Sequence, residues 1–246
     1  MSAPDGGRAR DAGPPQGANA PLGRSAIKAV TSAGAARRIG VFGGAFDPPH
    51  NMHVALVEAA LAQLHLDELR IFPTGYAWHK SRTLSAPEHR LAMAQLAFGG
   101  LPRVVVDPRE ILRPGPTYTI DTLRELQAEQ PDSALYLVMG ADQARALPTW
   151  HASEALLEAA IISVAARADE VQADGHSNPE FGARFDAASL PPPWNTGRFE
   201  ALQLPPMAVS ATDIRHRVGT SQGIAHLVPD GVARYIDQHH LYRTAR

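Results

Sequence analysis

From position 38 onward, short apolar runs alternate with longer segments in which apolar residues recur every third or fourth position. Short runs of this kind are typical of buried strands, and the longer period is typical of helices that pack one face on a core. The pattern predicts strands at 39–42, 69–72, 104–106, 135–139, 161–165 and, at a sheet edge, 202–204. It predicts helices at 52–64, 85–98, 119–128, across 141–159, from 210 onward and over 230–240. The second of these would open with a capping box at 85–88, Ser-Ala-Pro-Glu.

Strand and helix alternation predicts an α/β fold: a Rossmann-like, doubly wound, mainly parallel sheet with helices on both faces. The last two predicted helices follow the last strand and would form a small C-terminal helical part. Ligands of such sheets bind beyond the carboxyl ends of the strands. The segments that follow strands should therefore share one rim: Gly43 and Gly44, Pro73 and Thr74, Gly140 to Asp142, and Ala166 with Arg167.

Two segments do not fit this alternation. Residues 1–36 are rich in Gly, Ala, Pro and Arg and contain no aromatic residue, so we expect a disordered tail before a single domain over 37–246. An overlong gene start explains such a tail at least as well as a transit peptide. Residues 168–200 are irregular, and we expect a long loop with a short helix near 180–185.

Composition narrows the function classes. A net charge of −2 gives no sign of a nucleic-acid-binding surface, and the absence of cysteine excludes disulfides and thiolate chemistry. No apolar run approaches the roughly 18–20 residues that a membrane span requires, so we expect a cytoplasmic protein without membrane contact.

The most informative segment is 40–53, GVFGGAFDPPHNMH, which predicts an apolar strand, a glycine turn and a helix start. Glycines let a phosphate approach the main chain, and the first helical turn attracts its charge. His50 and His53 are three residues apart and would lie on one helix face. Two plainer interpretations are a metal pair, which would need further ligands, and ordinary capping or core histidines. Asp47 could contact a ligand, or it could simply favour a turn before proline.

Other phosphate-binding motifs are absent from the chain. No G-x-G-x-x-G follows the first strand, which disfavours a dehydrogenase, and no Gly-Lys-Ser/Thr follows any strand as a Walker A loop would require.

The GGAFDPPHxxH segment and Ser210-Ala-Thr-x-Ile-Arg215 resemble the HxGH nucleotidyltransferases, and within them the bacterial nicotinate-nucleotide adenylyltransferases. The resemblance covers about 38–243. Its further segments are 73–80 (PTGYAWHK), 117–122 (TYTIDT), 140–142 (GAD), 148–151 (PTWH), 228–230 (VPD), Tyr235-Ile236 and Leu241-Tyr242.

The resemblance implies adenylyl transfer from Mg-ATP to nicotinate mononucleotide, and it assigns roles to four groups of residues. Catalytic positions would be His50, His53, Lys80 and Arg215. ATP would contact Gly43, Gly44, Ala45, Phe46, Asp142, Ser210 and Thr212. The nicotinate nucleotide would contact Thr119, Trp150, His151 and Arg167, with backbone N–H groups around 150–151 receiving its carboxylate. No protein metal site is implied, because Mg²⁺ would be carried by the ATP phosphates.

Taken alone, several of these residues have plainer explanations. Lys80 could be a solvated loop cation, Ser210 a helix cap, Asp142 an N-cap and Trp150 a core aromatic. Arg215 alone would be a surface charge.

The chain departs from the family pattern at Met52, where HxGH has glycine, and at Ala45, where a hydroxyl residue is common. Two alternatives stay open: another transferase of the superfamily, such as one acting on phosphopantetheine, and a nucleotide-binding regulatory module without turnover. Met52 is the only motive for the second. The oligomeric state does not follow from the sequence.

Overall fold

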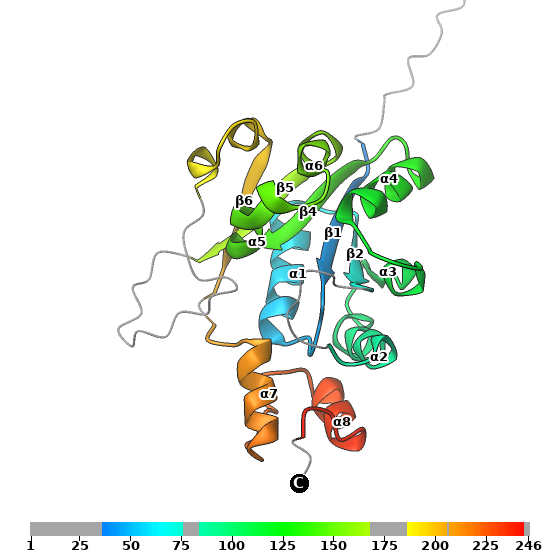
Figure 1. Cartoon of the computed structure of the whole chain (residues 1–246), viewed down its shortest axis with the longest axis vertical. Helices are drawn as coiled ribbons and strands as arrows, with labels where there is room; N and C mark the ends of the chain where they lie inside the picture. Colours follow the sequence, from blue (N-terminus) through cyan, green and yellow to red (C-terminus); the bar gives the residue numbers. More distant parts are fainter. Residues whose placement is uncertain (1–35, 76–83, 168–185, 206, 244–246) are drawn as a thin grey trace, which may run out of the picture. The chain divides into compact units, whose positions relative to one another are not determined.

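The computed structural model describes residues 36–75, 84–167, 186–205 and 207–243. Over these residues a six-stranded sheet forms in the order β3-β2-β1-β4-β5-β6, and every neighbouring pair is parallel (Figure 1). The strands are β1 (Arg38–Gly44), β2 (Glu68–Pro73), β3 (Val104–Val106), β4 (Ala134–Gly140), β5 (Ile161–Arg167) and β6 (Phe199–Leu204). This 3-2-1-4-5-6 order is that of doubly wound dinucleotide-binding folds, so the predicted fold class is confirmed.

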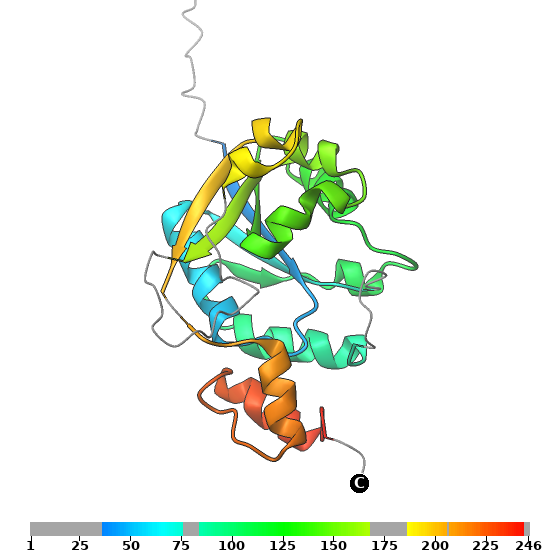
Figure 2. The ribbon, with the colours of Figure 1, turned by 60° about the vertical axis from the view of Figure 1, so that its left-hand side comes forward.

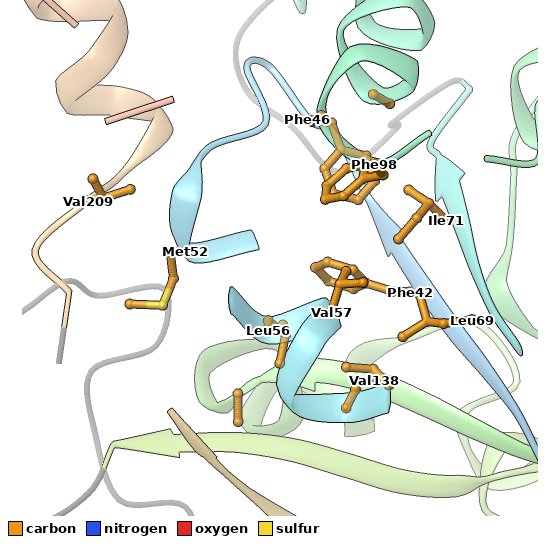
Figure 3. Packing of buried hydrophobic residues seen from close by; sticks show 14 of the residues in the cluster. Phe42, Phe46, Met52, Leu56, Val57, Leu69, Ile71, Phe98, Val138 and Val209 are labelled. Atoms are coloured by element: carbon orange, nitrogen blue, oxygen red, sulfur yellow. The ribbon is translucent and has the colours of Figure 1, made fainter. Parts of the chain in front are cut away.

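Each face of the sheet is covered by its own hydrophobic cluster. One cluster joins strand residues such as Phe42, Ile71 and Val138 to α1 (Asn51–Gln63), α2 (Pro87–Phe98), α7 (Ala211–Gly219) and α8 (Asp230–Gln238) (Figure 3). The other joins the alternate strand residues to α4 (Thr119–Glu129), α5 (Ala141–Ala146), the 3₁₀ turn η1 (Leu147–Thr149) and α6 (Ser153–Ala159). Because successive strand residues point to opposite faces, a sheet buried on both sides needs near-continuous apolar runs, and β4 is buried from Leu135 to Gly140.

The C-terminal helical part lies at one end of the domain. Figures 1 and 2 show α7 and α8 side by side beyond the first residues of α1, and α8 also packs along α2. Asn51, the first residue of α1, ties this part to the sheet domain: its backbone N–H donates to the Leu227 carbonyl at 3.0 Å and its amide Nδ2 donates to the His226 carbonyl at 3.1 Å.

Most element boundaries agree with the predictions to within one or two residues, but three details differ. The capping box expected at 85–88 is wrong: Ala86 is the N-cap of α2, Pro87 begins the helix, and the cap makes no side-chain hydrogen bond. The short helix α3 (Arg109–Leu112) was not expected, because four residues are too few to display a period. Within the predicted long loop, 3₁₀ turns occupy Ala187–Ser189 and Trp194–Thr196.

Some predictions concern residues that the structure does not describe. The short helix expected near 180–185 lies outside the described residues, and so does the predicted tail except for Ala36. The tail stays a prediction. Among the described residues, no helix is long and apolar enough to cross a membrane.

Candidate active site

The segment between β1 and α1 forms a tight turn at the carboxyl end of the sheet. Thr74 N–H, just after β2, donates to the Gly44 carbonyl at 2.9 Å, so the ends of two neighbouring strands are joined at this rim. Phe46 has a φ of 47° and its ring is buried against Phe98. A Cβ on Gly44 would meet the Phe46 ring at 3.0 Å, so a side chain here would require that ring to shift by a few tenths of an ångström.

Both predicted imidazoles lie at the start of α1 and are buried. His50 is the N-cap residue and His53 occupies the third helical position. Their rings stack with centroids 3.7 Å apart, and the His50 backbone N–H donates to His53 Nδ1 at 3.2 Å. Because Nδ1 accepts this bond, a neutral His53 carries its proton on Nε2.

The start of α7 is joined directly to this turn. Arg215 Nη1 donates to the backbone carbonyl of Asp47 at 2.8 Å, and Arg215 Nη2 donates to Thr212 Oγ1 at 3.0 Å. Ser210 caps the helix by accepting from Asp213 N–H at 3.1 Å. The structure therefore brings together the predicted phosphate-binding residues of two segments more than 150 positions apart in the chain.

Met52 does not intrude on the turn. Its side chain is fully buried in the first hydrophobic cluster, and Figure 3 shows it on the side of α1 that faces the segment carrying Val209. The side chain therefore points aside into the core. Ala45 takes part through its main chain, since its carbonyl accepts from Arg90.

Arg90 is a positioning residue that sequence reasoning missed. It is only 1% exposed and donates to four carbonyls, those of Ser85, Ala45, Thr74 and Gly75, at 2.6–3.2 Å. One guanidinium thus joins the β1–α1 turn, the end of β2 and the start of α2. A signal was present: Arg90 occupies the buried face of α2 together with Met93, Ala94 and Ala97, where an arginine needs buried acceptors.

The predicted acceptor residues come from two other loops that meet through a ring contact. The His151 and Tyr118 rings stack with centroids 4.0 Å apart at an angle of 28°. Tyr118 is the N-cap of α4, whose first residue is Thr119, and Trp150 follows η1 and packs partly on the second cluster. Thr119, Trp150 and His151 therefore lie in one region.

One hydrogen bond bears on the N–H groups predicted to receive the nicotinate carboxylate. The backbone N–H of Trp150 donates to the Leu147 carbonyl at 3.0 Å, which closes the 3₁₀ turn. It is thus already engaged, and a carboxylate at this place would have to use N–H groups that follow it in the chain.

Three predicted residues remain: Asp142, Arg167 and Lys80. Asp142 lies in the first turn of α5 and pairs with Arg145 at 2.8 Å, while Gly140 is the N-cap, so Asp142 is not the cap. The backbone of Arg167 ends β5 opposite Leu204 at the expected rim. Lys80 lies outside the described residues.

A buried carboxyl group lies behind the acceptor loop. Glu110 of α3 is 6% exposed, and Thr122 of α4 donates its hydroxyl to it at 2.8 Å. Burial raises the pKa of Glu110 to about 7, against the lowering effects of the Thr122 hydrogen bond and the Arg113 charge. The Glu110 carbonyl lies against Gly75, where any side chain would meet it at 2.0 Å, so α3 is packed on the end of β2.

Comparison with known proteins gives consistent results. A cytidylyltransferase-like family model matches residues 41–217. A protein of Albidiferax ferrireducens named "Probable nicotinate-nucleotide adenylyltransferase" is 56% identical over 209 residues, which cover 85% of this chain and 100% of that relative. A relative of the same name from Methylibium petroleiphilum is 45% identical over 214 residues, covering 85% of this chain and 94% of its own length.

Solved structures agree at the level of the fold. The Plasmodium falciparum nicotinic acid mononucleotide adenylyltransferase complexed with NaAD superposes with a TM-score of 0.62 at 18% identity, covering 84% of this chain and 97% of that one. At this identity the likeness concerns the fold, and the sequence relatives carry the assignment. The chain therefore belongs to the nicotinate-nucleotide adenylyltransferase family of cytidylyltransferase-like proteins.

Proposed function

We propose that this protein transfers the adenylyl group of ATP to nicotinate mononucleotide, giving nicotinate adenine dinucleotide and pyrophosphate as a step of NAD biosynthesis. The observation that carries the proposal is the bond from Arg215 to the Asp47 carbonyl, which joins the start of α7 to the turn that holds His50 and His53. Family membership supports the same reaction.

The reaction needs positioning and charge stabilisation more than proton transfer. A phosphate oxygen of nicotinate mononucleotide is already anionic at neutral pH, and it attacks the α-phosphorus of ATP while the bond to the pyrophosphate oxygen breaks. Charge grows on the bridging and leaving oxygens, so donors fixed in advance lower the barrier. This demand matches a site with imidazoles, a guanidinium and a helix start.

Each residue predicted to contact ATP, in the turn between β1 and α1 and elsewhere, then has a role. His53 would donate through Nε2–H to the α-phosphate, and His50 would lie beside the same phosphate chain. Ser210, Thr212 and the first N–H groups of α7 would receive the β- and γ-phosphates, with Arg215 neutralising charge. Lys80 would approach the phosphates from the segment after β2, Gly43 to Phe46 would line the turn, and Asp142 would accept from a ribose hydroxyl.

The acceptor residues would select the pyridine nucleotide. Trp150 would stack on the nicotinate ring, with Thr119, His151 and Arg167 around the nucleotide. N–H groups after Trp150 would receive the carboxylate, and a site with such donors rejects the uncharged amide because the donors would be left unpaired.

Mg²⁺ would enter with ATP. Among the described residues, no group of three or more His, Asp or Glu side chains is arranged to hold a metal ion, and the Asp47 carboxylate is engaged by Ser85 and Tyr242. Phosphate oxygens and water suit this ion as ligands, and when bound it would neutralise the leaving pyrophosphate.

An assay with two acceptors tests the proposal. The purified protein, full-length and with residues 1–36 deleted, would be given Mg-ATP with nicotinate mononucleotide or with phosphopantetheine, and pyrophosphate release would be measured. We expect turnover with the pyridine nucleotide only, in both forms. Activity with phosphopantetheine alone would contradict the proposal, and no turnover with either would favour the regulatory module. The motive for that module is weakened by the burial of Met52 in the core. The cytoplasmic location stays a prediction.

A further inference from the structure

The carboxylate of Asp47 joins three parts of the chain inside the phosphate-binding turn. The side chain is buried, with 2% of the residue exposed. Its Oδ2 accepts from the Ser85 backbone N–H at 3.2 Å and its Oδ1 accepts from the Tyr242 hydroxyl at 2.6 Å. Since the carbonyl of the same residue accepts from Arg215, Asp47 connects the starts of α2 and α7 and the segment after α8.

Tyr242 is held in place by its surroundings. Burial raises the pKa of its phenol strongly, and the nearby negative charge of Asp47 raises it further, so the hydroxyl stays protonated and donates to the carboxylate. Its backbone has a φ of 61°, a left-handed conformation that costs a tyrosine free energy and persists only where the neighbouring contacts determine it. The short O–H···O⁻ bond is of the strong, charge-assisted kind.

The hydrogen bond from Tyr242 helps to hold the orientation of Asp47. Asp47 lies three residues before His50, and its carbonyl is the acceptor of Arg215, so a rotation of this residue would move both the imidazoles and the guanidinium. The Tyr242 hydroxyl and the Ser85 N–H fix opposite oxygens of the carboxylate and so oppose that rotation.

We propose that Tyr242 is a positioning residue of the ATP site: through Asp47 it holds the phosphate-binding turn against α7, although it lies 195 residues further along the chain. The inference rests on the proposed use of ATP as the adenylyl donor. A plainer role, in which Tyr242 only fastens the C-terminal segment to the domain, would lower stability without changing nucleotide affinity.

Two matched hydroxyl deletions separate these roles. Tyr242→Phe removes the bond to Asp47, while Tyr235→Phe removes a bond of α8 to His89 Nδ1, 3.0 Å long and outside the turn. Thermal unfolding would be measured for both variants, together with KM for ATP, KM for nicotinate mononucleotide and the affinity for an α,β-methylene analogue of ATP. The analogue needs no acceptor, so its binding reports on Tyr242 even if turnover with nicotinate mononucleotide fails.

We expect Tyr242→Phe to weaken binding of the analogue and raise KM for ATP about 10-fold, as for loss of a hydrogen bond to a charged group. KM for nicotinate mononucleotide should stay within about twofold, and Tyr235→Phe should change neither constant beyond that. Affinity for the analogue within about twofold of the wild type in Tyr242→Phe would overturn the proposal.

A double-mutant cycle tests the route through Asp47. If Tyr242 acts only through that carboxylate, Asp47→Ala, which removes the acceptor, combined with Tyr242→Phe should bind the analogue no more weakly than Asp47→Ala alone. Additive losses would overturn the route. The cycle also uses a second variant, Asp47→Ala against wild type, should the tyrosine variant alone fold poorly: unchanged affinity in Asp47→Ala would overturn the proposal as well.

Discussion

The two halves of the candidate site are built in different ways. The turn between β1 and α1, which we propose binds the phosphates, is buried and held by hydrogen bonds between distant segments: Arg215 and Tyr242 reach Asp47 from 168 and 195 positions away. The acceptor region is more open, with an exposed His151 and a half-buried Trp150, and its two loops meet through a ring stack.

This difference suggests what each half must recognise. A triphosphate presents dense charge at fixed spacing, so its donors must be held rigidly, and buried charge-assisted bonds do that. A pyridine ring presents a flat apolar face, which an aromatic side chain can contact without such a framework. We therefore expect substitutions in the turn to affect catalysis or stability strongly, and substitutions among the acceptor loops to act on one substrate.

The largest expected effect is that of His53→Ala on turnover. Loss of a preorganised donor to the α-phosphate should lower kcat by about 10²–10³-fold. Steady-state kinetics and thermal unfolding would be measured together. His89→Ala is the control, since it removes a half-buried histidine with ring and hydrogen-bond contacts outside the turn. A His53→Ala enzyme within threefold of the wild-type kcat would contradict the phosphate role.

Met52→Gly tests how much the packing of Met52 contributes to the free energy of unfolding. The family glycine would leave a cavity where a fully buried side chain packs in the first cluster, and it would also weaken the first turn of α1. Together these effects should lower the free energy of unfolding by about 4 kcal/mol. Denaturant unfolding measures this change, and Met52→Leu, which conserves volume, should cost less than about 1.5 kcal/mol. Equal stability of the glycine variant and the wild type would mean that Met52 is not packed as described.

Glu110→Gln concerns the framework behind the acceptor loop. The raised pKa of Glu110, about 7 against 4.5, means that the folded state binds the proton more tightly than the unfolded state. The free energy of unfolding should therefore fall, through this group, as pH rises from 4.5 to 7, by up to about 3 kcal/mol.

The glutamine variant should lose that pH dependence, because its amide stays neutral and can still accept from Thr122. Unfolding would be followed at several pH values, with Glu158→Gln, on the surface of α6, as the control. Parallel pH profiles for Glu110→Gln and the wild type would show that the carboxyl group titrates normally.

The smallest expected effect is that of Trp150→Ala on acceptor binding. Loss of ring stacking should raise KM for nicotinate mononucleotide about 10-fold and leave KM for ATP within twofold. Trp150→Phe, which keeps an aromatic face, should lie between the alanine variant and the wild type. A rise of both KM values to the same extent would erase the distinction between the two halves.

The local patterns in the sequence were sufficient for the secondary structure and for the fold class. Strand and helix periods are set by neighbouring residues, so β1, α1 and β4 were predicted to within two residues, and alternation implied the parallel sheet. The helix α3 was not predicted because it is too short to show a period. The capping box predicted at 85–88 is absent because proline at the first helical position leaves Ala86 as the N-cap.

The sequence by itself also determined the family and the chemistry. The motifs that identify them, the turn with its two histidines and the Ser210 to Arg215 segment, are short runs of residues in a fixed order along the chain. Only the tertiary structure decided how these parts meet. A bond between residues 168 or 195 positions apart exists only once the chain has closed into its fold. For the same reason, local sequence could not predict the four carbonyl partners of Arg90, the direction of Met52 or the stack of Tyr118 on His151. The only local sign of these contacts was a charge on an apolar helix face, at Arg90.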